Sequence, residues 1–404
     1  MKVIHLNKFD IKGGASKAMM RIHQALIRCG VNSLVYVQKK HSNDDSILTD
    51  DRPAFRQLNK ILSKIDSIPT KLIGRSPNNF SPSFIGGAGL IDKINSLDPD
   101  IVHLHWICDG MMSIKDIARL NAPVVWTLHD NWAFSGGCHN MYSCKNHNYK
   151  SHQCGFFSRP FYNLKVKAYQ RKLSMGIVAP SQWLYQQSKS SSLLKSKPHF
   201  QIPNTIAEEL FRPLNKMQSR AIWRLPKNKK IILCGAVNIL TDSNKGFNLF
   251  LEASNLLECE NIELVVFGNH SNTSNLRSRH KLHFVGSIND DSKLNSLYDA
   301  ADIVVVPSLQ ENFSNVILES LSSGTPVVAF NVGGNKDLIQ NNFNGYLVEP
   351  FNTQDLAIKI SCALEKEKNN NLSLNARQSA AKFNFQTIAD SYKEMYISLL
   401  DASN

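Results

Sequence analysis

The sequence predicts an α/β protein built from two doubly wound domains that face a cleft. Short β-branched apolar runs alternate with segments of helical spacing along most of the 404 residues, as in parallel sheets covered by helices. Gly-rich loops follow several of these runs in each half, and the length suits two domains. We expect a first domain at residues 1–205 and a second at 206–385. A last helix, 386–404, is expected to pack back toward the first domain.

The chain carries a formal net charge of +13, which favours anionic partners such as nucleotides, phosphorylated lipids or an anionic membrane face. Nucleic acid ranks last, because the basic residues are spread out and no ladder of aromatic residues accompanies them. No apolar run approaches the ~18–20 residues of a membrane span. The first residues are typical of a strand rather than a signal peptide, so we expect a cytoplasmic protein.

The first strand is expected at residues 2–6, a helix at 15–29, and a second strand at 32–38. Gly13 and Gly14 precede the helix, where backbone N–H groups favour an anionic ligand. A tight turn that needs a positive φ is the alternative explanation for the two glycines. The loop contains no G-x-G-x-x-G pattern, so a dinucleotide site is not supported.

Residues 52–75 place Lys and Arg among apolar residues at helical spacing, which predicts a basic amphipathic helix or helix pair. Such a helix more often packs on its own domain. The alternative is attachment to an anionic membrane surface. The apolar positions are Phe55, Leu58, Ile61, Leu62, Ile65, Ile68 and Leu72.

Two further predicted strands, residues 101–107 and 123–130, carry histidines. His103 and His105 alternate along the first, and the second ends in His129 and Asp130. A side chain at the carboxyl end of a strand in an α/β sheet is well placed for a ligand. Elsewhere a histidine beside an aspartate is more often a surface hydrogen bond. The remaining strands of this half are expected at 175–181 and 199–204.

A loop rich in Cys and His follows the strand expected at 123–130. These residues are as dense in the loop as the ligands of a metal site. Its spacings are irregular and include no C-x2-C pair, which favours free thiols over a structural metal. The alternative metal ligands are Cys138, His139, Cys144 and Cys154. The other cysteines stand in apolar segments, as reduced core cysteines do: Cys29, Cys108, Cys234, Cys259 and Cys362.

The second half repeats the alternation of strands and helices. Helices are expected at 247–257 and 315–323, and an Asn-rich loop at 365–374. The strands are expected at 230–236, 262–268, 282–286, 301–307, 325–330 and 345–348.

Two carboxylates stand where the strand at 301–307 passes into the next helix. Glu311 follows the strand, and Glu319 comes eight residues later. Ligands of open α/β sheets bind at the carboxyl ends of strands. Taken alone, the spacing fits equally well with two solvated glutamates. An ionised carboxylate is suited to accepting hydrogen bonds from paired hydroxyl groups, so Glu319 is a candidate for a ribose and Glu311 for a sugar.

Positive charge for a phosphate is expected in the same half. Lys245 stands at a loop-to-helix junction and can neutralise a diphosphate. Backbone N–H groups near Phe313, Ser314 and Asn315, at the start of the helix after Glu311, can add donors. Together these residues describe a site for a nucleotide sugar.

The order of these motifs resembles that of the family 4 retaining glycosyltransferases, which have the GT-B fold. The resemblance covers nearly the whole chain. It rests on Gly13-Gly14, Thr127–Asp130, Ile202–Asn204, Lys245-Gly246, the Glu311–Glu319 element with its continuation to Val328, and Gly333-Gly334. Residues 103–106 and 127–139 are similar to the subgroup that builds bacterial exopolysaccharide, O-antigen and colanic-acid-type polymers.

This resemblance implies retaining transfer from a UDP- or GDP-linked sugar to a lipid-diphosphate-linked saccharide, without a divalent metal. The enzyme would be cytoplasmic, with attachment to the inner membrane face as a further expectation. The catalytic candidates are His129, Lys245 and Glu311. The acceptor-side candidates are His105 and Asp130. The donor-binding candidates are Gly13, Gly14, Asn238, Lys245, Phe313, Ser314, Asn315 and Glu319.

Two departures from the family pattern leave alternatives open. Asn238 lies where the family usually has a basic residue, so Lys245 would hold the diphosphate without an arginine partner. Phe157 stands where a fourth cysteine is expected, which weakens a metal or a disulfide in the Cys/His loop. The alternatives to an active transferase are a non-catalytic binding subunit with the same fold and a GT-B epimerase or phosphorylase.

Overall fold

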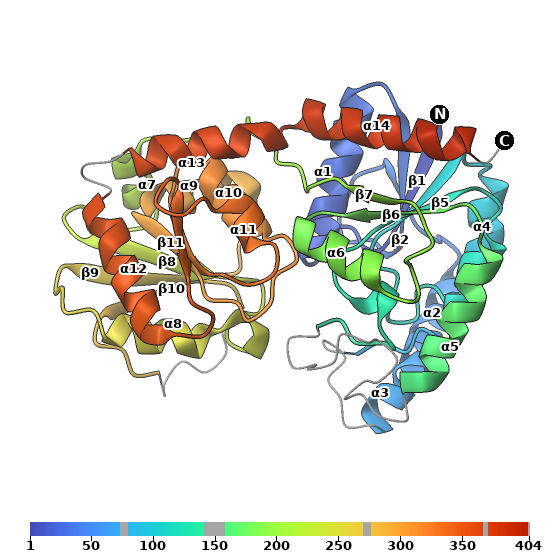
Figure 1. The fold of residues 1–404 in the computed structure, drawn as a ribbon, viewed down its shortest axis with the longest axis horizontal. Helices are drawn as coiled ribbons and strands as arrows, with labels where there is room; N and C mark the ends of the chain where they lie inside the picture. The colour runs from blue at the N-terminus through green and yellow to red at the C-terminus, as the bar shows by residue number, and fades with distance from the viewer. Residues whose placement is uncertain (73–79, 141–157, 270–275, 367–370, 403–404) are drawn as a thin grey trace. The chain divides into compact units, whose positions relative to one another are not determined.

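The computed structural model describes residues 1–72, 80–140, 158–269, 276–366 and 371–402 (Figure 1). The chain divides into two compact units. Unit 1 comprises Met1–Thr205 together with Phe385–Asn404, and unit 2 comprises Ile206–Asn384.

Unit 1 contains a parallel sheet of seven strands in the order β3-β2-β1-β4-β5-β6-β7. The order reverses between β1 and β4, which makes the carboxyl ends of these two strands the point where ligands bind in doubly wound sheets. The strands are β1 (Lys2–Phe9), β2 (Asn32–Lys39), β3 (Ile47–Leu48), β4 (Ile101–Leu104), β5 (Val124–Thr127), β6 (Met175–Ala179) and β7 (His199–Gln201).

Helices cover both faces of this sheet. The last helix belongs to unit 1 and packs against the first (Figure 1). The α-helices are α1 (Gly14–Arg28), α2 (Pro53–Asp66), α3 (Ile68–Leu72), α4 (Leu90–Ser96), α5 (Arg159–Arg171), α6 (Gln182–Ser190) and α14 (Phe385–Asp401). Among the described residues, unit 1 also contains the 3-10 helices η1 (Ile114–Arg119) and η2 (Trp132–Phe134).

The two faces of the unit 1 sheet differ in chemistry. Because side chains alternate along a strand, Leu6, Leu104 and Trp126 enter one large apolar core with residues of α4, α5 and α6. The opposite positions include His5 and His103, which are paired in register across β1 and β4. The face that carries these histidines is covered by α1 and α14. Unit 1 therefore buries polar side chains on one face of its sheet.

Unit 2 contains a parallel sheet of six strands in the order β10-β9-β8-β11-β12-β13. Its order reverses between β8 and β11. The strands are β8 (Lys230–Gly235), β9 (Ile262–Phe267), β10 (Lys281–Gly286), β11 (Ile303–Val306), β12 (Val327–Phe330) and β13 (Gly345–Val348).

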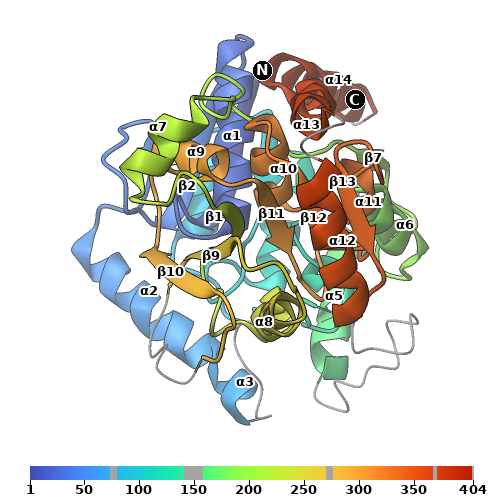
Figure 2. The same ribbon diagram turned by 90° about the vertical axis from the view of Figure 1, so that its left-hand side faces the viewer.

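The helices of unit 2 form a layer on each face of the sheet, as Figure 2 shows. Leu233 and Val304 pack against α9, α10 and α13, whereas Ile232 and Val305 pack against α8 and α12. The helices are α7 (Lys216–Ile222), α8 (Phe247–Asn255), α9 (Asp291–Ala300), α10 (Asn315–Ser322), α11 (Asn335–Leu338), α12 (Thr353–Lys366) and α13 (Leu372–Ala380), with η4 (Ser243–Lys245) and η5 (Ala381–Phe383) as 3-10 helices.

Several sequence-based predictions need correction. The loop expected at 365–374 is wrong at its end, because Leu372 is buried and begins α13. Cys259 is exposed rather than buried in a core. The strand expected at 101–107 ends at Leu104, so His105 lies in the loop beyond it. In the described part of the chain, none of the helices combines the length and apolar composition needed to cross a bilayer.

Candidate active site

An ion pair stands where β8 and β11 end in unit 2. Lys245 follows β8 in the short helix η4, and Glu311 follows β11. The Lys245 Nζ donates a hydrogen bond of 2.7 Å to Glu311 Oε1. The two side chains are 27% and 14% exposed, so both remain open to a ligand in part. The structure therefore brings together two of the predicted catalytic residues at the switch point of the unit 2 sheet.

Backbone contacts fix the two loops that carry this pair. The Leu309 N–H donates to the Asn244 carbonyl, and the Asn244 side chain donates to the Gln310 carbonyl. Gly246, with φ of +65°, is the N-cap of α8 and directly follows Lys245. A Cβ atom at Gly246 would lie 1.9 Å from the Pro307 carbonyl oxygen, so the close approach of the loops requires glycine here.

Glycine is also required behind Glu311. Gly333 has a φ of +54°, and a Cβ atom there would lie 1.8 Å from the Glu311 carbonyl oxygen. The Gly334 N–H donates to the same carbonyl at 3.0 Å. The Gly-Gly turn after β12 thus holds the backbone of Glu311 in place.

The electrostatics of the pair favour a charged lysine. Burial alone would lower the pKa of Lys245, but the Glu311 carboxylate raises it above its ordinary value. Lys245 is therefore an ammonium group at neutral pH. An ammonium has three donors, and the donor used by Glu311 leaves others that can serve a phosphate.

The residues expected at the next helix lie at its first turn. Ser314 is the N-cap of α10 and its hydroxyl accepts from the Ile317 N–H, while Asn315 is the first helical residue. Phe313 is buried and packs edge-to-face against Phe383. The start of α10 thus directs its N–H groups to the same edge of the sheet as Glu311.

Glu319 lies inside unit 2, and its residue is 2% exposed. Its Oε2 accepts a hydrogen bond of 2.9 Å from the phenol of Tyr298 on α9. The structure therefore gives Glu319 a role in joining α9 and α10. That role was not expected from the sequence.

Asn238 stands in the loop after β8, where the family pattern has a basic residue. Its Oδ1 accepts a hydrogen bond of 3.0 Å from the side chain of Asn269. Asn269 in turn accepts from Ser287, which follows β10. Asn238 thus belongs to a neutral polar network at the carboxyl ends of β8, β9 and β10.

In unit 1, Gly13 and Gly14 lie after β1, at the start of α1. Gly13 has a φ of +91° and no atom within 4 Å of an added Cβ, so its conformation rather than crowding requires glycine. No side chain of the described residues caps α1 at Gly13. Asn7 holds this loop, because it accepts from the Trp106 N–H and donates to Ser16. Asn7 was missed in the sequence because a polar residue within a strand gives no signal of its own.

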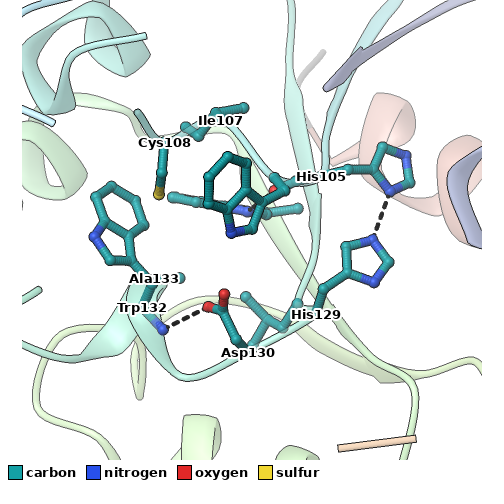
Figure 3. Close-up of a pocket in the computed structure, with 10 residues that line it drawn as sticks. His105, Ile107, Cys108, His129, Asp130, Trp132 and Ala133 are labelled. Carbon is teal, nitrogen blue, oxygen red and sulfur yellow. Dashed lines mark hydrogen bonds between the residues drawn. The ribbon is translucent and has the colours of Figure 1, made fainter. Parts of the chain in front are cut away.

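His105 and His129 lie after β4 and β5 and are hydrogen-bonded to each other (Figure 3). The distance between His105 Nδ1 and His129 Nε2 is 2.9 Å. Burial lowers the pKa of His129 to about 4, although Asp130 opposes this effect. His129 is therefore neutral at physiological pH. Residues around it line a pocket of about 10 Å³, roughly the space of one water molecule.

Asp130 faces His139 rather than His129. Its Oδ2 lies 2.6 Å from His139 Nδ1, and its Oδ1 accepts from the Trp132 N–H. Burial alone would raise the pKa of Asp130, but His139 and the Trp132 N–H hold it below its ordinary value. The other His139 nitrogen, Nε2, bonds to the Ser81 hydroxyl. Asp130 therefore fixes the loop after β5.

The Cys/His loop departs from expectation where the structure describes it. Cys138 is disulfide-bonded, so the expected free thiol is wrong at this position and the sulfur is not a thiolate ligand. His139 uses both ring nitrogens for Asp130 and Ser81. Cys144, His147, His152 and Cys154, as well as Phe157, lie outside the described residues.

Two protein-family models match the chain. Residues 12–210 match the model described as "Glycosyltransferase Family 4", and residues 215–379 match "Glycosyl transferases group 1". Residues 12–210 therefore form a domain of the family 4 glycosyltransferases, and residues 215–379 form a domain of the glycosyl transferases group 1.

Curated relatives match over shorter segments. An uncharacterized glycosyltransferase of Methanocaldococcus jannaschii is 38% identical over 146 residues, 34% of this chain and 36% of that protein. The N,N'-diacetylbacillosaminyl-diphospho-undecaprenol alpha-1,3-N-acetylgalactosaminyltransferase of Campylobacter jejuni is 30% identical over 190 residues, 46% of this chain and 44% of that protein. The chain thus spans less than half the length of these curated relatives.

Solved structures share the fold over the whole chain. Sucrose-phosphate synthase of Thermosynechococcus elongatus has a TM-score of 0.69 at 19% identity and covers 100% of both chains. The Anabaena protein HepE, solved with UDP and glucose, has a TM-score of 0.67 at 18% identity and covers 98% of this chain and 100% of its own. WaaG, described as involved in lipopolysaccharide biosynthesis, has a TM-score of 0.68 at 16% identity, with 98% and 99% covered. These likenesses show the GT-B fold.

Proposed function

We propose that this protein is an active retaining glycosyltransferase that takes its sugar from a UDP- or GDP-linked donor. The observation that carries the proposal is the Lys245–Glu311 ion pair at the switch point of the unit 2 sheet. The ammonium neutralises the leaving diphosphate, and N–H groups at the start of α10 add donors. Glu311 accepts from sugar hydroxyls and Glu319 from the ribose. Because this charge comes from the protein, the proposed reaction requires no divalent metal.

For unit 1 we propose that His129 positions the donor sugar. It is a neutral imidazole at the carboxyl end of β5, so it can donate or accept one hydrogen bond without carrying charge. The Gly13-Gly14 turn offers backbone N–H groups to a phosphate oxygen. His105 and Asp130 belong to the acceptor side.

The proposed acceptor is a lipid-diphosphate-linked saccharide of bacterial surface polysaccharide synthesis. The name of the Campylobacter relative includes diphospho-undecaprenol, and WaaG is described as a glycosyltransferase involved in lipopolysaccharide biosynthesis. Other relatives are named D-inositol 3-phosphate glycosyltransferases, so a soluble phosphorylated acceptor is the competitor that an assay must include.

A membrane-associated acceptor fits an exposed surface on α2 and α3, which we call the α2–α3 stripe. Its apolar side chains recur at helical spacing and are 38% to 81% exposed: Leu58, Ile61, Ile65, Ile68 and Leu72. Exposed basic residues accompany them: Arg56, Lys60, Lys64 and Lys71. We propose that this stripe binds the anionic face of the inner membrane, because apolar and basic side chains on one helix suit a lipid interface. The protein is then cytoplasmic and peripheral to the membrane.

The test is release of nucleoside diphosphate from a panel of UDP- and GDP-sugars. Each donor is offered with a polyprenyl-diphosphate saccharide, inositol 3-phosphate or fructose 6-phosphate. We expect turnover only with the lipid diphosphate. Lys245→Ala should reduce kcat/KM by about 100-fold or more, because it removes charge that stabilises the leaving group.

Lys293→Ala is the matched control, since Lys293 is an exposed lysine on α9 of the same unit. It should leave turnover unchanged. Turnover that survives Lys245→Ala would contradict the site assignment. If no donor in the panel binds or turns over, the protein is a non-catalytic binding subunit. Turnover with a soluble phosphorylated acceptor alone would reject the lipid-linked substrate.

A further inference from the structure

Unit 1 buries an unusual group of imidazoles on the polar face of its sheet. His5, His23, His103 and His105 are each at most 3% exposed, and His129 lies beside them. Burial lowers the pKa of His5, His103 and His105 well below the ordinary value, so these rings are neutral. The proposed function uses His129 directly and places His105 on the acceptor side, but it leaves the inner rings of His5, His23 and His103 unexplained.

Three of the rings form a continuous chain of hydrogen bonds. His5 Nδ1 lies 2.9 Å from His105 Nε2, and His105 Nδ1 lies 2.9 Å from His129 Nε2. The chain runs from β1, inside unit 1, to the loop after β5. His103 and His23 lie beside this chain but are not part of it. His103 is hydrogen-bonded to Tyr396 and Thr127, and His23 to Ser33.

We propose that His105 is a positioning residue which, backed by His5, holds His129 with its ring proton on Nδ1. A neutral imidazole has one N–H and one acceptor nitrogen, so each link of the chain needs a proton on one side only. Only two arrangements of the three protons satisfy both links. Either all three rings carry the proton on Nδ1, or all three carry it on Nε2.

The inner end of the chain decides between the two arrangements. His5 Nε2 is buried and has no hydrogen-bond partner among the described residues. A proton on Nε2 would leave a buried N–H group unsatisfied, and orphaned buried donors are rarer than orphaned acceptors. The arrangement with Nδ1 protonated throughout is therefore favoured.

Because His5 Nε2 has no hydrogen-bond partner among the described residues, the chain of imidazoles holds one tautomer and does not relay protons. Moving to the other arrangement would require a proton to leave His129 Nδ1 and another to reach His5 Nε2. No group among the described residues hydrogen-bonds to that nitrogen to supply one. His129 consequently keeps its ring proton on Nδ1, while its Nε2 accepts from His105.

A metal ion bound by these histidines is the competing explanation. Ring nitrogens of His5, His103 and His105 lie within 4.8 Å of one another. The cluster contains no carboxylate to offset a buried divalent charge. Both ring nitrogens of His103 already bond to hydroxyl groups. Hydrogen bonding thus accounts for the arrangement of the rings.

The test is nuclear magnetic resonance of the full-length protein labelled with ¹⁵N-histidine, since protonated and unprotonated ring nitrogens have well-separated ¹⁵N shifts. Signals of each ring are assigned by their loss in single variants. We expect His5, His105 and His129 to be neutral at pH 7, with Nδ1 protonated in all three. A proton on Nε2 of any of them, a charged ring, or a stoichiometric metal removed by a chelator would overturn the proposal.

Variants separate positioning from folding. In His105→Asn the amide nitrogen can replace Nδ1–H as the donor to His129, so the His129 tautomer should persist. In His105→Leu that donor is lost, and His129 should shift toward the Nε2–H tautomer, which is preferred by free imidazole. His23→Phe is the control, because His23 contacts His5 but lies outside the chain of hydrogen bonds. An unchanged His129 tautomer in a folded His105→Leu protein would also overturn the proposal.

The kinetic consequence rests on the proposed function. His105→Leu should lower kcat by about 10-fold or more with little change in the donor KM, and His105→Asn should recover most of it. The tautomer measurement needs no substrate. If no glycosyl transfer is found, the spectra still decide whether the chain holds His129, so the two proposals fail separately.

Discussion

Glu319 is a buried carboxylate with two candidate roles. Its Oε2 accepts from the phenol of Tyr298, which joins α10 to α9 inside unit 2. The proposed function also assigns it to ribose hydroxyls. These roles differ in what they require: the helix contact needs an acceptor oxygen, whereas strong binding of hydroxyls gains from the negative charge.

Two substitutions separate the roles of Glu319. Glu319→Gln keeps an oxygen near Tyr298 but removes the charge. The Kd for the nucleotide should therefore increase by about 10- to 100-fold, because a hydrogen bond to a charged group contributes ~1.5–3 kcal/mol. Tyr298→Phe should lower the unfolding free energy by about 1 kcal/mol and leave nucleotide Kd nearly unchanged. Calorimetric titration with UDP and GDP, beside urea unfolding, measures both. Equal nucleotide affinity in all three proteins would leave Glu319 a structural residue only.

Residue types in the candidate site were predictable, but their partners were not. Lys245 and Glu311 were placed at one sheet edge from the ends of their strands, and the structure pairs them. The link from His5 to His105 depends on the pairing of β1 with β4, which the sequence does not reveal. The contact between Asp130 and His139 could not be predicted from the sequence either, because it depends on how the loop after β5 folds back.

At the scale of elements, the strands of unit 2 were all predicted, because each is a short, largely apolar run beside a Gly or Pro. In unit 1, the two-residue strand β3 was missed, being too short for a pattern. In unit 2, the helices α9 and α12 were missed, although Leu294, Leu297 and Tyr298 show a helical period in α9. The Asn-rich composition hid the start of α13, whose Leu372 is buried in the core beside α12.

The α2–α3 stripe gives a prediction at this scale. Its most exposed residue is Leu72, at 81%, and Ile61 in the middle is 55% exposed. Ile61→Glu should reduce binding to vesicles of anionic phospholipid by about 10-fold or more, because it removes apolar contact and adds a repelled charge. Cosedimentation with vesicles at low and high salt measures the loss, and salt should weaken the wild-type protein too.

Ile358→Glu is the matched control for this experiment, since Ile358 is 57% exposed on α12 of unit 2. It should bind vesicles as the wild type does. Equal losses for both variants would indicate a general charge effect. Binding unaffected by Ile61→Glu would reject the α2–α3 stripe as the membrane contact and leave it as a helix that serves its own unit.

At the scale of the whole molecule, the buried histidines of unit 1 tie stability to pH. The pKa of His23 falls to about 4 through burial, and so does that of His129. Burial also lowers the pKa of His5, His103 and His105. In the unfolded chain these rings return to an ordinary pKa of about 6.5. Between about pH 4 and 6.5 the unfolded state thus binds more protons than the native state.

This imbalance fixes the sign of the pH dependence. Stability rises with pH wherever the unfolded state binds more protons, so the contribution is complete above about pH 6.5 and is lost as pH falls toward 4. Each histidine contributes at most about 1.4 kcal/mol of unfolding free energy per pH unit in that window. The raised pKa of Asp66, caused by burial, acts in the opposite direction but is a single group.

Urea unfolding followed by tryptophan fluorescence measures this effect, because four of the five tryptophans lie in unit 1. Trp223→Phe removes the signal of unit 2, so the remaining transition reports unit 1 alone. We expect the urea midpoint of unit 1 to fall steeply between pH 7 and pH 5. His23→Gln should make that fall shallower by the share of one titrating group, because glutamine takes up no proton on unfolding. A urea midpoint that stays constant over this range would contradict the prediction, since it would mean that burial does not lower the pKa of the imidazoles in unit 1.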